Sequence, residues 1–195
     1  MTRLFLLAAL LTAPALAVAQ PGSATRIGLG VRIGTVPFLY DETGDLSLFG
    51  APRVSVPVDV NGVVRIEPEI GIASTSFSSG SDEQTTRQTA LGVAVSALVP
   101  REDLTLTVGG RLRYLRSTFA YSFGPDDRET TGVTFAIGPL IGGEYPFSDR
   151  FALGAEVGLE YRAYTLDYSF SGNTSNDDGR SGYGTTAALS ARFFF

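Results

Sequence analysis

The last thirteen residues of the chain, 183–195, alternate between two kinds of side chain, and this alternation limits the possible folds more than any other feature. Every second residue from Tyr183 to Phe195 belongs to a mostly apolar set, whereas the residues between them are small or polar, except Phe194. A period of two is the pattern of a β-strand. Because a tilted strand needs roughly 9–11 residues to cross a lipid bilayer, the segment predicts a membrane-spanning strand.

Seven earlier segments show the same alternation, so about eight strands are expected, the others beginning near residues 26, 52, 63, 89, 104, 132 and 151. Short connections are predicted after the second, fourth and sixth strands, and long ones at about 41–48, 74–88, 117–131 and 165–180. This pattern predicts an all-β fold, a transmembrane antiparallel up-and-down β-barrel. Its termini would lie on the periplasmic side and its long loops would point outward.

The connection between the second and third expected strands is predicted from parity. The apolar residues are even-numbered in both strands, from Val54 to Val60 and from Val64 to Ile72. A bare two-residue Asn-Gly turn would move three charged residues onto the apolar face: Arg65, Glu67 and Glu69. We therefore expect a three-residue loop that pairs residue 59 with residue 63 and places Gly62 in the left-handed position of a G1 bulge.

Alternation alone does not distinguish a lipid-facing apolar surface from the apolar core of a soluble, lipocalin-like barrel. The opposite face is rich in glycine, which weakens an exposed strand but makes room inside a narrow barrel. Its charges are arginines mixed with aspartates and glutamates, with no lysine in the chain. This mixture suits bidentate ion pairs in a confined interior. We therefore expect the apolar face to contact lipid.

Aromatic residues are expected at both rims of such a barrel, where their rings lie at interfacial depth. The predicted topology places one group at the periplasmic rim and a second near the opposite rim. The first group is Tyr145, Phe147, Phe151, Phe193 and Phe195, and the second is Phe38, Tyr40, Tyr114, Tyr161, Tyr164 and Tyr183.

The inward face of the expected barrel carries many charged residues. An eight-stranded barrel has an interior only wide enough for its side chains to fill. We therefore expect a structural network of ion pairs there, with a polar conduction path as the alternative. The candidate residues are Arg32, Arg53, Asp59, Arg65, Glu67, Glu69, Arg111, Arg113, Glu144, Glu156, Glu160, Arg162 and Arg192.

Residues 1–19 have the features of a secretory signal peptide, with Arg3 near the start, an apolar run over 4–11 and small residues at the end. Its removal would leave residues 20–195 as one barrel domain. The net charge of −5 argues against nucleic-acid binding.

Cysteine and histidine are both absent from the sequence, which excludes thiolate metal sites and serine–histidine catalysis. Carboxylate-only catalysis through Glu156 and Glu160 is the alternative, but both fit the ion-pair network better. We expect no metal, no cofactor and no enzyme activity.

The chain resembles the small eight-stranded outer-membrane barrels of bacteria related to OmpX and to the transmembrane domain of OmpA. The resemblance rests on Leu189, Ala191, Phe193 and Phe195 at the end of the sequence and on the segment EYPFSDRFALG at 144–154, a turn typical of that group. It implies location in the outer membrane of a Gram-negative bacterium and insertion by the barrel-assembly machinery with the help of periplasmic chaperones. Those four C-terminal residues would then serve as an assembly signal. We also expect contact with lipid and lipopolysaccharide, and a monomeric state.

Two functions agree with this interpretation. The first is a structural or surface-interaction role in adhesion, defence or envelope integrity, carried by extracellular loops whose ligand the sequence does not identify. The second is a narrow pore or conduit for small solutes or apolar molecules.

Overall fold

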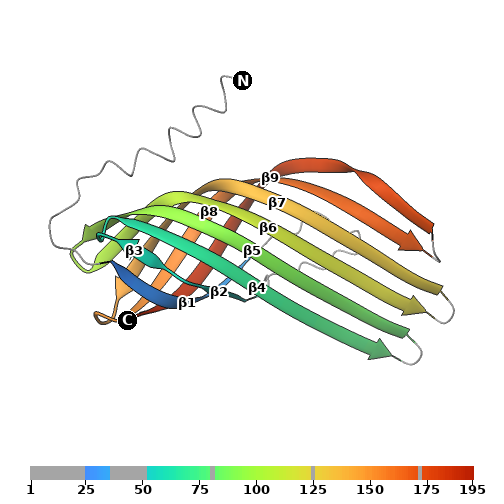
Figure 1. Cartoon of the computed structure of the whole chain (residues 1–195), viewed down its shortest axis with the longest axis horizontal. Coiled ribbons are helices and arrows are strands. Elements are labelled where there is room, and N and C mark those ends of the chain that lie inside the picture. Colours follow the sequence, from blue (N-terminus) through green and yellow to red (C-terminus); the bar gives the residue numbers. More distant parts are fainter. Residues whose placement is uncertain (1–24, 36–51, 80–81, 124–125, 171–172) are drawn as a thin grey trace, which may run out of the picture.

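The structure, a computed structural model, describes residues 25–35, 52–79, 82–123, 126–170 and 173–195. Almost all of these residues lie in β-strands of one antiparallel sheet (Figure 1). The strands are β1 (Arg26–Thr35), β2 (Arg53–Ser55), β3 (Val58–Val60), β4 (Val64–Ser79), β5 (Asp82–Arg101), β6 (Leu104–Phe123), β7 (Asp126–Pro146), β8 (Phe151–Phe170) and β9 (Asn173–Phe194).

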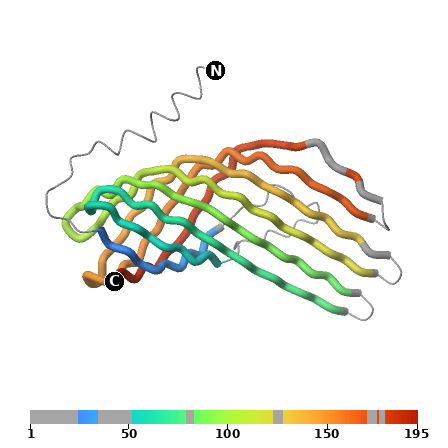
Figure 2. The backbone as a smooth tube through the Cα atoms, in the orientation of Figure 1, coloured from blue at the N-terminus to red at the C-terminus, as the bar shows by residue number. Residues whose placement is uncertain are grey.

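The sheet closes into a ring because its first and last strands pair. From β4 to β9 each strand pairs with the next, and β1 pairs with β9 from Gly28↔Phe194 to Thr35↔Ala187. β2 and β3 lie in line between β1 and β4, so together they occupy one position in the ring. The ring therefore has eight positions, and the predicted all-β up-and-down barrel is confirmed. Figure 2 shows the course of the backbone around the barrel, from the blue first described strand to the red last one.

The second predicted strand is interrupted at Val56 and Pro57, between β2 and β3. Proline has no N–H group to donate to a strand ladder, which explains the break. Hydrogen bonds to both neighbouring strands continue across it. The Gly28 amide donates to the Pro57 carbonyl at 2.9 Å, and the Val56 amide donates to the Pro68 carbonyl at 3.0 Å. The interruption is therefore local and does not change the ring.

The turn between β3 and β4 differs from the predicted one by two residues of register, because Val60 pairs with Val64. Asn61 and Gly62 have positive φ angles of 54° and 67°, and the Val63 amide donates to the Val60 carbonyl at 3.2 Å. These are the features of a type I′ turn. Val63 is an additional residue after that turn, so the apolar residues of both strands still share one face. The predicted parity is correct and the predicted register is wrong.

Three of the four long connections predicted from the sequence are strands instead. In the three hairpins the described strands reach residues 79 and 82, 123 and 126, and 170 and 173. In the hairpin of β4 and β5 the pairing continues from Ile72↔Thr89 to Ser79↔Asp82. The high content of serine, threonine and charged residues in these segments predicted connections, although the threonines favour β structure. Alternation does continue in two of them, at Phe119, Tyr121 and Phe123 on β6 and at Leu166, Tyr168 and Phe170 on β8. Figure 1 shows the hairpins continuing the sheet past the end of β1.

Some predictions fall outside the described residues. These are the signal peptide at 1–19, the connection at 41–48, and the aromatic residues Phe38 and Tyr40. Within the part of the chain that the structure describes, no helix is long and apolar enough to span a membrane.

We name the end of the barrel where β1 begins and β9 ends the terminal end, and the opposite end the hairpin end. Between them a band of apolar side chains covers the outside of the barrel. Such a continuous exposed apolar surface is costly in water and fits a hydrocarbon environment. The band includes Ile27, Leu29, Val31, Ile33, Val54, Ile66, Ile70, Leu91, Val108, Leu112, Ile141, Val157, Leu159 and Leu189.

The height of this band matches a membrane. Aromatic residues bound it on β7 at Phe135 and Tyr145 and on β9 at Tyr183 and Phe193, and in both strands they are ten residues apart. At about 3.3 Å per residue and a tilt of about 40°, ten residues span roughly 25 Å along the barrel axis, the height of the lipid-facing band of a transmembrane barrel.

Rings at each boundary pack against one another. Near the hairpin end, the ring centroids of Tyr161 and Tyr183 are 5.4 Å apart, and those of Tyr114 and Phe135 are 5.2 Å apart. Phe135 is not among the aromatic residues predicted for this rim. Tyr164, which is among them, shares the parity of the inward-facing Arg162. At the terminal end the pairs are Tyr145–Phe147 at 5.0 Å, Phe147–Phe151 at 5.9 Å and Phe193–Phe195 at 5.6 Å.

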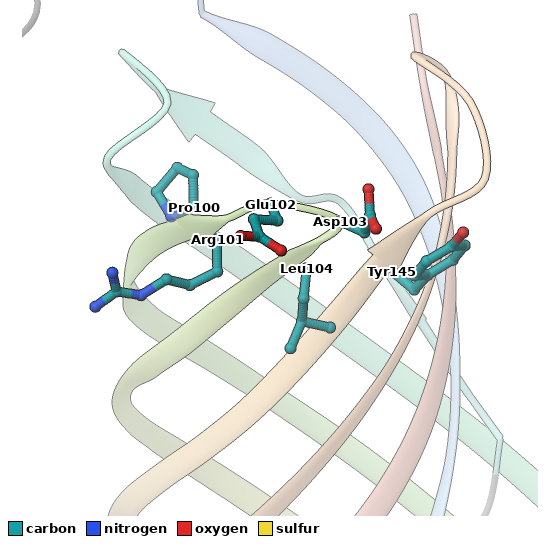
Figure 3. Close-up of a pocket in the computed structure, with 6 residues that line it drawn as sticks. All are labelled: Pro100, Arg101, Glu102, Asp103, Leu104 and Tyr145. Atoms are coloured by element: carbon teal, nitrogen blue, oxygen red, sulfur yellow. The ribbon is translucent and has the colours of Figure 1, made fainter.

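The turn between β5 and β6 places polar side chains at the terminal end. Arg101 pairs with Leu104 across Glu102 and Asp103, and Glu102 has a φ of 21°, at the edge of the left-handed region. Figure 3 shows this turn beside Tyr145, with which it lines a shallow hollow. Every residue that lines the hollow is exposed. We therefore interpret it as the surface of a turn at the membrane interface and not as a binding site.

We expect an arginine in the middle of the apolar band to destabilise the barrel more than one at its edge. Ile141 lies between Phe135 and Tyr145 on β7 and is 53% exposed, so Ile141→Arg should cost about 2–4 kcal/mol in a bilayer. The matched variant Leu104→Arg, at the terminal end, should cost about 0–1 kcal/mol. Urea titration of protein refolded into lipid vesicles measures both free energies of unfolding. Equal losses would contradict the membrane depth assigned to these residues.

Candidate functional site

The interior of the barrel holds the densest group of charged residues in the described structure. All thirteen residues predicted for the lumen point inward, because each lies on the strand face opposite the apolar band. Twelve of them are at most 6% exposed. The thirteenth, Glu156, has a side chain that is 11% exposed. The structure therefore brings the predicted residues together in one buried cluster.

At the terminal end the charges form a chain across the barrel. Arg65 on β4 donates to Asp59 on β3 through Nε at 2.6 Å and to Glu144 on β7 through Nη1 at 2.6 Å. Arg192 on β9 donates to the same Glu144 through Nη1 at 2.7 Å. These guanidinium groups therefore connect strands that are not neighbours in the sheet.

Glu67 on β4 is the central acceptor of the network. Arg192 donates to it through Nε at 3.0 Å, and Arg32 on β1 donates through Nη2 at 2.9 Å. The hydroxyl of Ser55 donates at 2.7 Å. One carboxylate thus joins β1, β2, β4 and β9.

A second layer lies next to Glu67 on the side of the hairpin end. Arg32 donates to Glu69 as well, and its Nη2 atom lies 3.2 Å from Glu156 on β8. Arg111 on β6 donates to both oxygens of Glu156, through Nη2 at 2.9 Å and through Nη1. Arg53 lies directly opposite Arg32 in the β1–β2 pairing. Its Nη1 atom is 3.7 Å from Oε1 of Glu69, which is beyond hydrogen-bond distance.

Three charges form the layer nearest the hairpin end. Glu160 on β8 accepts hydrogen bonds from Arg113 on β6 and from Arg162 on its own strand, the latter from Nη2 at 3.2 Å. Arg113 and Arg162 occupy the same row of the sheet, on either side of Ala136. Glu160 therefore separates two like charges that would otherwise face each other.

The network leaves little scope for acid–base chemistry. Each of the six interior carboxylates contacts at least one arginine. Glu156 and Glu160, the pair considered for carboxylate catalysis, each contact two arginines. These contacts hold the carboxylate oxygens of both residues within the network. The arrangement is suited to filling and tying together the barrel.

Phe194 is the one residue out of step in the alternation of the last strand, and sequence reasoning assigns it no role. In the structure its ring faces the interior at the terminal end and is 3% exposed. The guanidinium carbon of Arg65 lies 5.3 Å from the ring centroid, and that of Arg26 lies 4.6 Å from it. These are cation–π distances. The break in parity is the signal that could have identified Phe194 as part of the interior.

The four residues predicted as an assembly signal lie on the outer face of β9 and just after it. Leu189, Phe193 and Phe195 are exposed, and Ala191 is half-buried. This placement gives them contact with lipid. Their role in assembly stays a prediction.

Comparison with known proteins gives a family and a fold. The model of the family described as outer membrane protein beta-barrel domain matches residues 4–193. The structure is similar to a major outer membrane protein from Thermus thermophilus, with 12% identity, a TM-score of 0.59, and coverage of 88% of this chain and 100% of that one. It is also similar to Ail, the attachment invasion locus protein of Yersinia pestis, in complex with the heparin analogue sucrose octasulfate. That likeness has 14% identity, a TM-score of 0.52, and coverage of 88% of this chain and 97% of the other.

At such identities these likenesses show the fold alone. Comparison with curated protein sequences gives no match.

We expect loss of the central carboxylate to be far more costly than loss of a rim charge. Glu67→Gln leaves Arg32 and Arg192 without a shared counter-charge in a buried site, so the free energy of unfolding should fall by about 3–5 kcal/mol. The control Arg26→Gln removes a side chain that is 48% exposed and pairs with Asp59, and should cost about 0–1 kcal/mol. Urea titration in lipid vesicles measures both. A loss at Glu67 no larger than the loss at Arg26 would show that the network does not stabilise the barrel.

Proposed function

The chain belongs to the outer membrane protein β-barrel domain family and lies in the outer membrane, and we propose that it works there as a surface-contact protein. The three hairpins would make the contacts, and the charged interior would keep the barrel closed. The observation that carries this proposal is the extension of β4 to β9 as a paired sheet beyond the aromatic boundary of the apolar band.

The orientation follows from the topology of such barrels. Short turns lie at the terminal end and the extended hairpins lie at the opposite end, so we propose that the terminal end faces the periplasm and the hairpin end faces outward. Residues 1–19 would be removed as a signal peptide and 20–195 would form the barrel domain. Insertion by the barrel-assembly machinery, helped by periplasmic chaperones, would use the aromatic end of β9.

A paired sheet suits surface contact better than four flexible loops. Its backbone N–H and C=O groups are already hydrogen-bonded within the hairpins, so little conformational entropy is lost when a partner binds. Its side chains are therefore presented in a defined register, with serine, threonine and charged residues on both faces.

Charge indicates which partners this sheet fits. Residues 73–88, 115–131 and 164–182 together contain eight aspartates and glutamates but four arginines. Ail was solved with a heparin analogue, sucrose octasulfate. An acidic surface repels sulfate groups. We therefore propose a neutral or basic partner surface for this protein and not a sulfated polysaccharide.

Lipopolysaccharide is a second proposed contact, at the level where the hairpins leave the membrane. Arg116 is exposed and lies two residues beyond Tyr114 on the outer face of β6. Arg87 on β5 lies on the same face, because Thr89 pairs with Arg116 and Arg87 with Thr118. Two arginines just above an aromatic boundary are suited to lipid phosphate groups.

The closed interior supports a non-enzymatic role and argues against the alternative function, a narrow pore or conduit. The interior carboxylates are held by arginines, and the chain contains no histidine. A solute would have to displace several buried ion pairs to pass, and breaking each is costly in a low-dielectric interior. We propose that the protein is a monomer in which the network is structural.

Shortening the hairpins should remove binding without unfolding the barrel. Replacing residues 74–87, 118–131 and 165–179 by an Asn-Gly turn keeps the last pairs Ala73↔Gln88, Ser117↔Gly132 and Tyr164↔Arg180. Binding of the full-length and shortened proteins, in lipid nanodiscs, to immobilised basic, neutral and sulfated polymers is the measurement. We expect the full-length protein to prefer the basic or neutral polymer and the shortened one to bind none. Unchanged binding after shortening, or a preference for the sulfated polymer, would contradict the proposal.

Planar-bilayer recording distinguishes the surface-contact role from the pore. We expect the wild-type protein, refolded in detergent, to insert without a stable unit conductance, because its interior is filled. A porin recorded under the same conditions serves as the positive control for insertion and detection. A reproducible unit conductance from the wild-type protein would favour the pore over the closed barrel.

A further inference from the structure

The inner face of the sheet changes character where the hairpins leave the apolar band. Within the band the inward residues are charged or small, and the outward ones are apolar. In the hairpins the same inward face carries large apolar and aromatic residues. They are Phe77 on β4, Leu115 and Phe119 on β6, and Tyr164, Leu166 and Tyr168 on β8, and each shares the parity of the buried charges on its own strand.

The outer face of the hairpins is polar at the same level. Ser76, Thr85, Ala120, Glu129 and Ser169 pair consecutively across the sheet from β4 to β8. The hydroxyls of Ser76 and Thr85 lie 3.1 Å apart, within hydrogen-bond distance. The two faces of the sheet therefore exchange polarity beyond the membrane, and the apolar side chains of the hairpins gather on the inside.

Strand pairing places two aromatic rings on either side of small residues. Phe119 on β6 and Tyr168 on β8 both pair with Thr130 on β7. Because neighbouring strands are about 4.8 Å apart, the Cα atoms of the two aromatic residues lie about 10 Å apart. The next inward residue of β7 is Gly132, and a Cβ atom there would lie 3.2 Å from Leu166 Cδ2. The large side chains thus belong to β6 and β8, and β7 between them carries small ones.

These inward aromatic side chains are exposed. Phe77 is 66% exposed, Phe119 40% and Tyr168 42%, whereas Arg113, farther down the same face of β6, is 1% exposed. Exposed apolar area is unfavourable in water, and a contiguous patch of it marks a surface of interaction. Aromatic residues are also the ones that most often supply the energy of a protein interface. The inner face of the hairpins is therefore suited to a partner with apolar side chains.

Acidic residues are concentrated in the hairpins that carry this face. Residues 73–88, 115–131 and 164–182 contain four arginines and eight carboxylates, so their net charge is four minus eight, or −4. Asp82 and Asp126, from neighbouring hairpins, both pair with Phe123 near the tips. A net negative charge attracts cationic partners and repels anionic ones. Apolar rings and negative charge together favour a partner that is both apolar and basic.

We propose that the inner face of the hairpins binds a cationic amphipathic peptide segment. Its apolar side chains would pack over β7 between Phe119 and Tyr168, and its lysine or arginine side chains would be attracted by the acidic hairpins. A polycation without apolar side chains would leave the rings exposed, and an uncharged apolar ligand would gain nothing from the charge. Such binding rests on the surface-contact role proposed for the hairpins and specifies its face and its ligand.

Tryptophan fluorescence measures this binding without background, because the chain contains no tryptophan. The protein is refolded into nanodiscs of zwitterionic lipid and titrated with a short peptide of alternating leucine and lysine that carries a single tryptophan. We expect a saturable shift of the emission to shorter wavelength as the indole leaves water. Empty nanodiscs are the control for binding to lipid. Analogues with glutamate in place of lysine, or serine in place of leucine, should bind about tenfold more weakly or less.

Serine substitutions on the inner face test the contact itself. Phe119→Ser and Tyr168→Ser should each weaken binding of the lysine peptide about tenfold or more, because each removes an aromatic anchor. The matched control is Phe147→Ser, which removes a 60% exposed ring at the terminal end and should bind like the wild type. Faster migration of the unheated protein in a denaturing gel verifies that each variant is folded.

Three outcomes would each overturn the proposal. They are wild-type affinity in both inner-face variants, equal affinity for the glutamate analogue, and no binding beyond that of empty nanodiscs. The last is the result expected if another segment of the chain or a second copy covers this face.

The protein with shortened hairpins separates failure of this site from failure of the surface-contact role. If the inner-face variants bind the immobilised polymers and the lysine peptide like the wild type and the shortened protein binds neither, the surface-contact role stands and the inner face is not its site. If the shortened protein binds like the wild type, the surface-contact role of the hairpins is itself wrong.

Discussion

Ion pairs between arginine and carboxylate groups inside a ring of eight strands are the interaction on which the rest of this structure depends. The outer face of every strand must be apolar to meet lipid, and backbone hydrogen bonding requires the ring to close. The inner faces then enclose a narrow space that only side chains can fill. Arginine is long enough to cross it, as Arg65 on β4 does to reach Glu144 on β7. A buried arginine needs carboxylates and other acceptors beside it, and a buried carboxylate needs arginines. The network therefore extends along most of the membrane-spanning part of the barrel.

The same network accounts for small residues beside large ones on the inner face. A Cβ atom on Gly92 would lie 2.9 Å from the Glu69 side chain and 3.1 Å from that of Arg113. Glycine at this position therefore provides the volume that the two charged side chains occupy. At Gly138 the constraint is the backbone, because a Cβ atom there would come within 1.9 Å of the Leu159 carbonyl oxygen on β8. Glycine thus serves both the filling of the barrel and the close approach of its strands.

Beyond the membrane the two faces of the same strands carry different kinds of side chain. Inside the apolar band, each strand separates apolar from polar side chains, because its two faces meet lipid and the filled interior. Past the aromatic boundary at Tyr183, both faces of the sheet carry polar residues, and stability comes from the backbone ladder of the hairpins. The anchoring part and the presenting part of the protein are therefore one continuous sheet, without a separate domain for binding.

Period-two alternation determined the strands within the membrane, the lipid-facing surface and the membership of the charged interior, because each of these follows from which face a residue occupies. It did not determine the partners. That Glu67 joins Arg32 and Arg192, or that Arg53 is left with one distant carboxylate, depends on the shear and register of the closed ring, which bring together residues more than a hundred positions apart. The extent of the hairpins and the contacts of Phe194 with Arg26 and Arg65 were also decided by tertiary structure, since strand pairing and cation–π contacts depend on residues from other strands.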